Sequence, residues 1–152
     1  MELSVDVANA YLRSGFEQMI RVAERLGDDL VSERPVGEAT NSVAGLIAHC
    51  CGVAEYWLGH EGLGRESTRD RDAEFRTTAT VEVLREMVTA RMAQVEIDVA
   101  DLNRLGLAPG PTRRDELPGG ATEASIVVHV IEEVFQHTGH MDIAADVLLA
   151  RG

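Results

Sequence analysis

The sequence predicts an all-α protein, a four-helix bundle with long connections between helices two and three and between helices three and four. Four segments carry apolar residues at alternating steps of three and four, the spacing of one face of a helix. Turn-rich stretches separate these segments, and no stretch of useful length alternates in the manner of a strand. At 152 residues the chain can bury a core, and we expect residues 1–152 to form a single domain.

The first helix is predicted to run from about Val5 to Leu26. Its apolar seam has the narrow spacing of a bundle helix, with Leu12, Phe16, Met19, Ala23 and Leu26. We expect Gly27 and the two aspartates after it to end the helix, and Pro35 and Gly37 to mark the loop that follows.

The second helix is expected to begin at a cap provided by Asn41 or Ser42 and to run to about Gly59. The third is expected to begin near Thr80. One side of this third helix is apolar, with Leu84, Val88, Met92, Val95, Val99 and Leu102.

Two connections are longer than a bundle needs. Residues 62–78 are strongly charged, and residues 104–120 contain three prolines. Loops of this length often carry function or cross over the end of a bundle. For the second connection, a solvated loop without function is an equally good interpretation.

The composition excludes several classes of function. A net charge of −12 argues against nucleic-acid binding and against docking on anionic membranes. No apolar run approaches the roughly 20 residues of a membrane span, and no secretion signal is visible at the start, so we expect a cytoplasmic protein. All 14 basic residues are arginine, which is typical of a GC-rich bacterial genome.

The cysteines are the neighbours Cys50 and Cys51. Adjacent side chains on a helix diverge by about 100°, so we expect reduced, partly buried thiols rather than a disulfide. A zinc-thiolate role for Cys50 is a weaker alternative, because its side chain points away from that of His49.

The fourth helix is expected to begin after Gly119–Gly120, with Thr122 as its cap, and to continue to about Leu149. It carries the most informative pattern in the chain, HVIEEVFQHTGH. Four polar residues in this run follow one another at steps of four, four and three, within an arc of about 80° on one face: His129, Glu133, His137 and His140. Their neighbours are apolar, and buried imidazoles and carboxylates are costly unless paired, so the stripe is a candidate metal site.

A catalytic zinc usually takes three protein ligands, so a further donor from another helix is expected. His49 is the best candidate, because it lies in an apolar helix between Gly45 and Gly52, which leave space for a pocket or a close helix crossing. On its own it would more often be an ordinary core histidine. Together, His49, Glu133 and His137 form a His₂Glu set that suits zinc with one water retained.

The two remaining histidines of the stripe have less defined roles. His140 can replace one of these ligands or orient one from outside the coordination sphere, and it is the stripe's only obvious general base; we assign it as the catalytic residue. His129 either supports Glu133 or is a buried histidine bonded to a backbone carbonyl.

This combination resembles the DinB-like superfamily of metal-binding four-helix bundles, which includes mycothiol-dependent maleylpyruvate isomerase and related thiol S-transferases. That family has a His on the second helix and a (His/Glu)-x3-His pair on the fourth, followed by x-Gly-(Gln/His). This chain has His49, then Glu133-VFQ-His137, then Thr138-Gly139-His140, and NSVAGLIAHCCGVAEYWLG and RDRDAEFR also resemble a bacterial subgroup of the superfamily.

The resemblance implies zinc, with nickel as the alternative, held by His49, Glu133 and His137. It also implies a low-molecular-weight thiol such as mycothiol as cosubstrate. One position departs from the pattern: the subgroup often has an arginine where this chain has Ala145. That arginine's contribution to substrate binding or to the fold must therefore be made differently here.

Three functions are consistent with these residues. A metal-dependent thiol S-transferase or isomerase, acting on a small-molecule thiol and an electrophile, is the preferred one, because metal coordination deprotonates a thiol. A metal-dependent hydrolase and a non-enzymatic, metal-stabilised stress protein are the alternatives, and the number of protein ligands distinguishes a structural from a reactive metal. The surfaces of the second and fourth helices are candidates for forming a homodimer.

Overall fold

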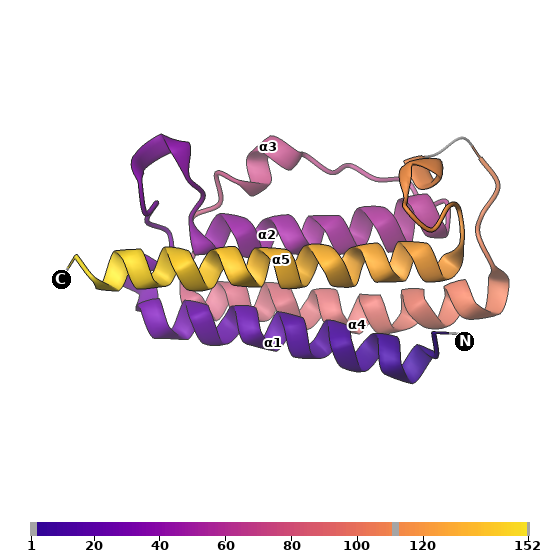
Figure 1. Ribbon diagram of the computed structural model, residues 1–152, viewed down its shortest axis with the longest axis horizontal. Helices are drawn as coiled ribbons and strands as arrows, with labels where there is room; N and C mark the ends of the chain where they lie inside the picture. Colours follow the sequence, from indigo (N-terminus) through magenta and orange to yellow (C-terminus); the bar gives the residue numbers. More distant parts are fainter. Residues whose placement is uncertain (1–2, 111–112, 152) are drawn as a thin grey trace.

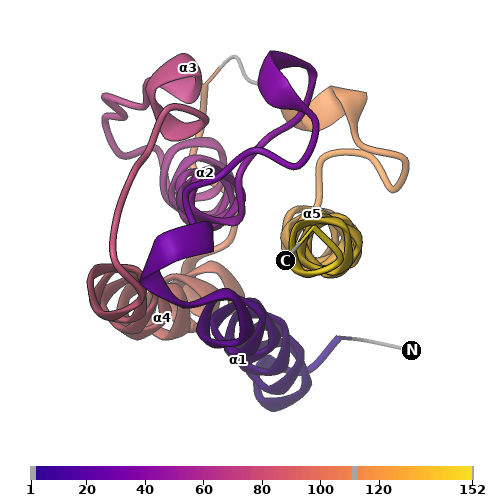
Figure 2. The ribbon, with the colours of Figure 1, turned by 90° about the vertical axis from the view of Figure 1, so that its left-hand side faces the viewer.

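The predicted four-helix bundle is confirmed. The computed structural model describes residues 3–110 and 113–151, and none of these residues lies in a strand. The four long helices lie side by side (Figures 1 and 2): α1 (Val5–Leu30), α2 (Val43–Ala54), α4 (Val81–Leu105) and α5 (Glu123–Leu149). Shorter helical segments lie between them: η1 (Gly37–Ala39), η2 (Glu55–Gly62), α3 (Arg71–Glu74) and η3 (Arg113–Glu116).

Side-chain caps begin the long helices where the sequence predicts them. The hydroxyl of Ser42 accepts the N–H of Gly45 at the start of α2, which decides between Asn41 and Ser42. Thr80 caps α4 and Thr122 caps α5 in the same manner. Each cap satisfies one of the backbone donors that the first turn of a helix leaves unpaired.

One predicted helix end was confirmed in part and one was wrong. Gly27, with φ 67° and ψ 178°, interrupts the regular geometry of α1 directly after Leu26, as predicted, but helical structure resumes beyond it and α1 extends to Leu30. The regular part of α2 ends at Ala54, and the chain continues as the π-helix η2. Local residue preferences do not reveal a change from α- to π-type bonding, because it adds one residue to a turn without breaking the helix.

The direction of the helices explains why one connection is long. The helix α1 packs against α4 and α5, and α2 packs on the same two helices from the other side. Since α2 and α4 run in the same direction, the chain must return along the bundle between them, and residues 63–80 do so over α2, carrying α3 (Figure 1). A long crossover of this kind is one of the known ways to connect a four-helix bundle.

The connection between α4 and α5 is packed against the bundle rather than solvated over its described residues. Leu117 and Arg114 are buried, and Arg114 donates to the carbonyl oxygen of Ala108 at 2.8 Å. The carboxylate of Glu61, buried at the end of η2, accepts the Tyr56 hydroxyl and the backbone N–H of Arg113. The described residues of this connection are therefore held in a defined position beside η2.

The apolar seams predicted from the sequence form the core. Its largest fully buried side chains include Phe16 and Met19 of α1, Ile47 of α2, Leu84 of α4 and Met141 of α5. Cys50 and Cys51 are free thiols, as predicted, and they are buried more completely than expected, within the same core. Across the described residues, no helix is long and apolar enough to cross a membrane.

Candidate metal centre

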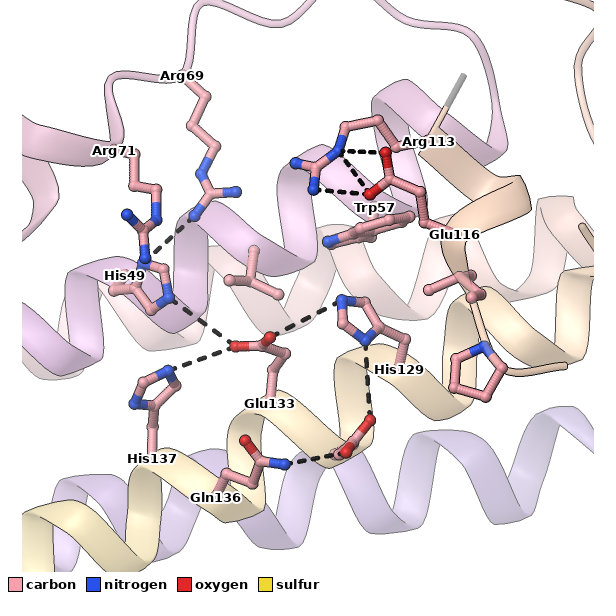
Figure 3. A pocket seen from close by; sticks show the side chains of 14 residues that line it. His49, Trp57, Arg69, Arg71, Arg113, Glu116, His129, Glu133, Gln136 and His137 are labelled. Atoms are coloured by element: carbon pink, nitrogen blue, oxygen red, sulfur yellow. Dashed lines mark hydrogen bonds and ion pairs between the residues drawn. The ribbon is translucent and has the colours of Figure 1, made fainter. Parts of the chain in front are cut away.

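The predicted donors His49, Glu133 and His137 meet between α2 and α5 (Figure 3). The helix α2 provides His49, and one face of α5 provides the other two, one turn apart. Oε2 of Glu133 lies 3.3 Å from Nε2 of His137 and 3.9 Å from Nε2 of His49. Among the residues that the structure describes, these three are the group of His, Cys, Asp and Glu side chains close enough to hold a metal ion.

Their spacing fits a small divalent ion. Metal–ligand bonds of about 2.0–2.1 Å in a tetrahedral site place neighbouring donor atoms roughly 3.3 Å apart. Of the three donor pairs, Glu133–His137 is already at this distance, Glu133–His49 is 3.9 Å apart, and all donor atoms lie within 4.8 Å of one another. Two imidazole nitrogens and one carboxylate oxygen form a donor set that zinc accepts, and three protein donors leave one tetrahedral position for another molecule.

The protonation of the group also suits metal binding. Burial lowers the pKa of His49, against the opposing effect of its hydrogen bond to Glu74, so its imidazole is neutral at neutral pH. The hydrogen bond from His137 lowers the pKa of Glu133, against the effect of burial, so this carboxylate is ionised. Neutral imidazole and charged carboxylate are the forms that coordinate metals.

His49 has a polar partner on its other nitrogen that the sequence did not reveal. Its Nδ1 lies 2.9 Å from Oε2 of Glu74, at the end of α3. Arg69 donates to both oxygens of the same carboxylate, at 2.6 and 2.9 Å, and its Nη2 lies 3.3 Å from Nδ1 of His49. The crossing segment 63–80 thus contributes directly to the surroundings of the site.

The two glycines beside His49 allow this close approach. A Cβ at Gly52 would lie 1.9 Å from Oε1 of Glu74, and a Cβ at Gly45 would lie 3.1 Å from the carbonyl oxygen of Phe75. The ring of Phe75 stacks on His49 with centroids 4.5 Å apart. Of the two interpretations of these glycines, a close crossing is confirmed, but the crossing element is the connection and not a bundle helix.

His129 lies on the other side of Glu133. Its Nε2 is 3.8 Å from Oε1 of that carboxylate, and its ring contacts Trp57 edge-on with centroids 4.5 Å apart. The hypothesis that His129 supports Glu133 is consistent with this position. His140 lies outside the group: it is exposed, and its Nδ1 is 3.4 Å from Nδ1 of His137, the nitrogen that faces away from Glu133.

The three donors line a pocket of ≈ 680 Å³ (Figure 3). Besides the donors, side chains from both long connections form its wall, among them Arg69, Arg71, Arg113, Glu116 and Leu117. Arg113 is paired with Glu116 and lies over the ring of Trp57, 5.9 Å from the centroid. The pocket wall therefore carries charges of both signs, with Arg69, Arg71 and Arg113 beside Glu116, Glu132 and Glu133.

Sequence reasoning missed the contributions of Arg69, Glu74, Trp57 and Arg113. The strong charge of residues 62–78 and the resemblance of RDRDAEFR to a bacterial subgroup were signals, but neither assigns a contact. Cys50 takes no part: it is buried, and burial raises the pKa of its thiol well above the ordinary value. Its alternative role as a thiolate ligand has no support in the geometry.

Comparison with known protein families identifies the family of this chain. The family model described as mycothiol-S-transferase matches residues 7–148. No curated protein and no solved structure matches the chain.

Proposed function

The chain belongs to the mycothiol S-transferase family, and from this premise we propose that it is a metal-dependent enzyme that transfers a small electrophilic substrate onto a low-molecular-weight thiol of the mycothiol type. The observation that carries the proposal is the convergence of His49, Glu133 and His137 in one pocket. Isomerisation assisted by the same thiol is the closely related reaction.

We assign the metal to these three residues, with zinc as the expected ion and nickel as the alternative. When bound, the ion supplies positive charge that lowers the pKa of a coordinating thiol, so that the sulfur is available as a thiolate at neutral pH. The helices α2 and α5 hold the three donors in place around the metal position. The pocket beside them is lined by charged side chains.

The reaction forms one bond and breaks another. The thiol releases its proton to solvent, the sulfur donates an electron pair to the electrophilic carbon, and the leaving group departs with the electrons of its former bond to that carbon. Arg71 lies at the pocket wall without an ion pair to any described residue, and its charge stabilises negative charge that develops on the electrophile.

The position of His140 supports an open site over a closed structural one. A structural zinc takes four protein ligands, and His140 or His129 was the candidate for the fourth. Since His140 lies beside the outer nitrogen of His137, it cannot approach the same ion without a change of rotamer. His129 lies 3.8 Å from Oε1 of Glu133, whereas His49 and His137 lie near Oε2 of that carboxylate. The two alternatives, a metal-dependent hydrolase and a metal-stabilised stress protein, are distinguished from the transferase by measuring bound metal and thiol turnover.

The test combines metal analysis with turnover. We expect metal-loaded protein to conjugate mycothiol to a bimane- or chlorodinitrobenzene-type electrophile, and His137→Ala to lose both bound metal and turnover. His60→Ala is the matched control, because this histidine lies outside the pocket lining and should leave both properties intact. Metal retained by His137→Ala would contradict the ligand set.

The outcome with other thiols separates the alternatives. Bound metal without turnover of mycothiol, bacillithiol or glutathione would contradict the transferase and favour a hydrolase or a metal-stabilised protein. The cytoplasmic location and the absence of nucleic-acid binding stay predictions from composition.

A further inference from the structure

The crossing segment between α2 and α4 has a feature that bundle packing does not explain. It places a carboxylate, Glu74, on the one nitrogen of His49 that faces away from Glu133 and His137. Both side chains are nearly removed from water, with 5% of His49 and 11% of Glu74 exposed. Removing a carboxylate from water is costly, so its position requires compensating partners.

Arg69 provides that compensation. Its guanidinium bonds to both carboxylate oxygens in a fork, a geometry that is strong and directional. Arg69 and Glu74 belong to the same short stretch of chain, so the pair is formed locally and docks onto α2 as a unit. Gly52 leaves the space that the carboxylate occupies.

The ring of His49 has two neutral tautomers, and its neighbours favour different ones. If Nδ1 carries the proton, it donates to Glu74 at 2.9 Å, and Nε2 presents a lone pair to the donor group. If Nδ1 is bare, it can only accept from Arg69 at 3.3 Å, and Nε2–H would point at Glu133. The contact of Nδ1 with Glu74 is shorter than its contact with Arg69, and Arg69 already donates to both oxygens of Glu74. Both observations favour the tautomer with the proton on Nδ1.

We propose that Arg69 and Glu74 form a positioning pair that holds His49 in the Nδ1–H tautomer with Nε2 directed at the metal position. The inference rests on the metal site of the proposed function. A carboxylate on the second nitrogen of a ligand histidine fixes its orientation and raises its basicity, and loss of such a partner typically weakens metal binding about 10–100-fold. The connection 63–80 is thus part of the metal site.

Metal affinity provides the first test. We expect Glu74→Ala to weaken zinc binding, measured by competition with a chromogenic chelator, by about 10–100-fold. Asp72→Ala is the matched control: this exposed carboxylate lies on the same short helix, and the variant should bind zinc as the parent does. Unchanged affinity in Glu74→Ala would overturn the proposal.

Gly52→Ala tests the same contact without removing a charge. The added methyl group would displace the carboxylate from His49, while alanine favours the helix more than glycine does. We therefore expect weaker zinc binding with an unfolding midpoint that is unchanged or higher, a combination that general damage to the fold does not produce. Parent-like zinc binding by Gly52→Ala would count against the pair, even if Glu74→Ala does not fold.

The tautomer can be read in metal-free protein by long-range ¹H–¹⁵N NMR correlations of the His49 ring. We expect Nδ1–H in the parent and in Asp72→Ala, and its loss in Glu74→Ala. An Nε2–H tautomer in the parent would overturn the proposal. Because this measurement needs no metal, failure of the proposed function and failure of the positioning pair are distinguishable.

Discussion

At the scale of single residues, the two ligand histidines have different partners on their second nitrogens. His49 faces a buried carboxylate, whereas His137 faces the exposed imidazole of His140 at 3.4 Å. For Nε2 of a neutral His137 to coordinate a metal, its Nδ1 must carry the proton, and Nδ1 of His140 lies where it can accept a hydrogen bond from it. A solvated imidazole is a weaker hydrogen-bond acceptor than a buried carboxylate, so we expect His137 to be oriented less strictly than His49.

The role of His140 as a catalytic residue stays a prediction, and its contact with His137 adds a second hypothesis, that it positions this ligand. We expect His140→Ala to weaken zinc binding by less than about 10-fold and to lower kcat/KM, because the orientation of His137 is less restricted. His140→Gln keeps an acceptor at this place and should restore most of both quantities. A loss of kcat/KM at unchanged zinc affinity would instead mean that His140 acts on the substrate.

The vicinal cysteines should be chemically inert in the folded protein. Burial raises the pKa of Cys51 to about 12 and that of Cys50 well above its ordinary value. Since the thiolate is the reactive form, a raised pKa leaves almost none of it near neutral pH. We expect a chromogenic disulfide reagent to leave native protein unlabelled and to react with both thiols in denaturant; stoichiometric labelling of native protein would contradict this burial.

At the scale of elements, the kink in α1 depends on one glycine. Gly27 combines φ 67° with ψ 178°, a region essentially restricted to glycine, and a Cβ there would meet no atom within 4 Å. The cost of a side chain is therefore conformational and not steric. The bend directs the last turn of α1 toward the loop that leads to α2.

We expect Gly27→Ala to lower the free energy of unfolding by about 1–3 kcal/mol, measured by urea denaturation. Gly139→Ala is the matched control. It also adds a methyl group in open space, but on the regular helix α5, where alanine should be neutral or stabilising by up to about 1 kcal/mol. Equal effects of the two substitutions would show that the backbone conformation of Gly27 is not the cause.

At the scale of the whole molecule, metal binding should be coupled to stability. The three donors come from two helices that are far apart in the sequence, so the complete set exists only in the folded state. A ligand that binds only the folded state stabilises it by about 2.7 kcal/mol at 100 times its Kd.

We therefore expect a chelator to lower Tm in a calorimetric scan and added zinc to restore it. His137→Ala should show the same Tm with chelator and with zinc. A zinc-dependent rise of Tm in that variant would indicate binding elsewhere on the chain.

Association of the chain with itself stays a prediction. The helix α5 presents Val128, Ile143 and Val147 to solvent, and the last two lie one turn apart near its C-terminal end. Sedimentation equilibrium tests whether this face pairs: we expect a homodimer that Ile143→Glu converts to a monomer. A monomeric parent would contradict the prediction.

The sequence by itself determined the four long helices, most of their boundaries and the polar stripe on α5. These features depend on neighbours within a few turns: apolar spacing, capping hydroxyls such as those of Ser42 and Thr122, and the fixed angle between successive residues. The same local geometry placed Glu133 and His137 on one face. His49 was predicted as the third donor because it lies in an apolar helix and because of the family resemblance. In the structure these three predicted donors lie close together.

Only the tertiary structure decided which nitrogen of each histidine faces the pocket and what lies behind it. Helical periodicity fixes the direction of a side chain but neither its rotamer nor its distance from another element. The contact between His49 and Glu74 spans 25 residues and depends on how a charged connection crosses α2, so no local pattern encodes it. Helical periodicity also placed His140 on the same face of α5 as Glu133 and His137. Because periodicity does not give distances between side chains, it did not reveal that His140 lies outside the donor group.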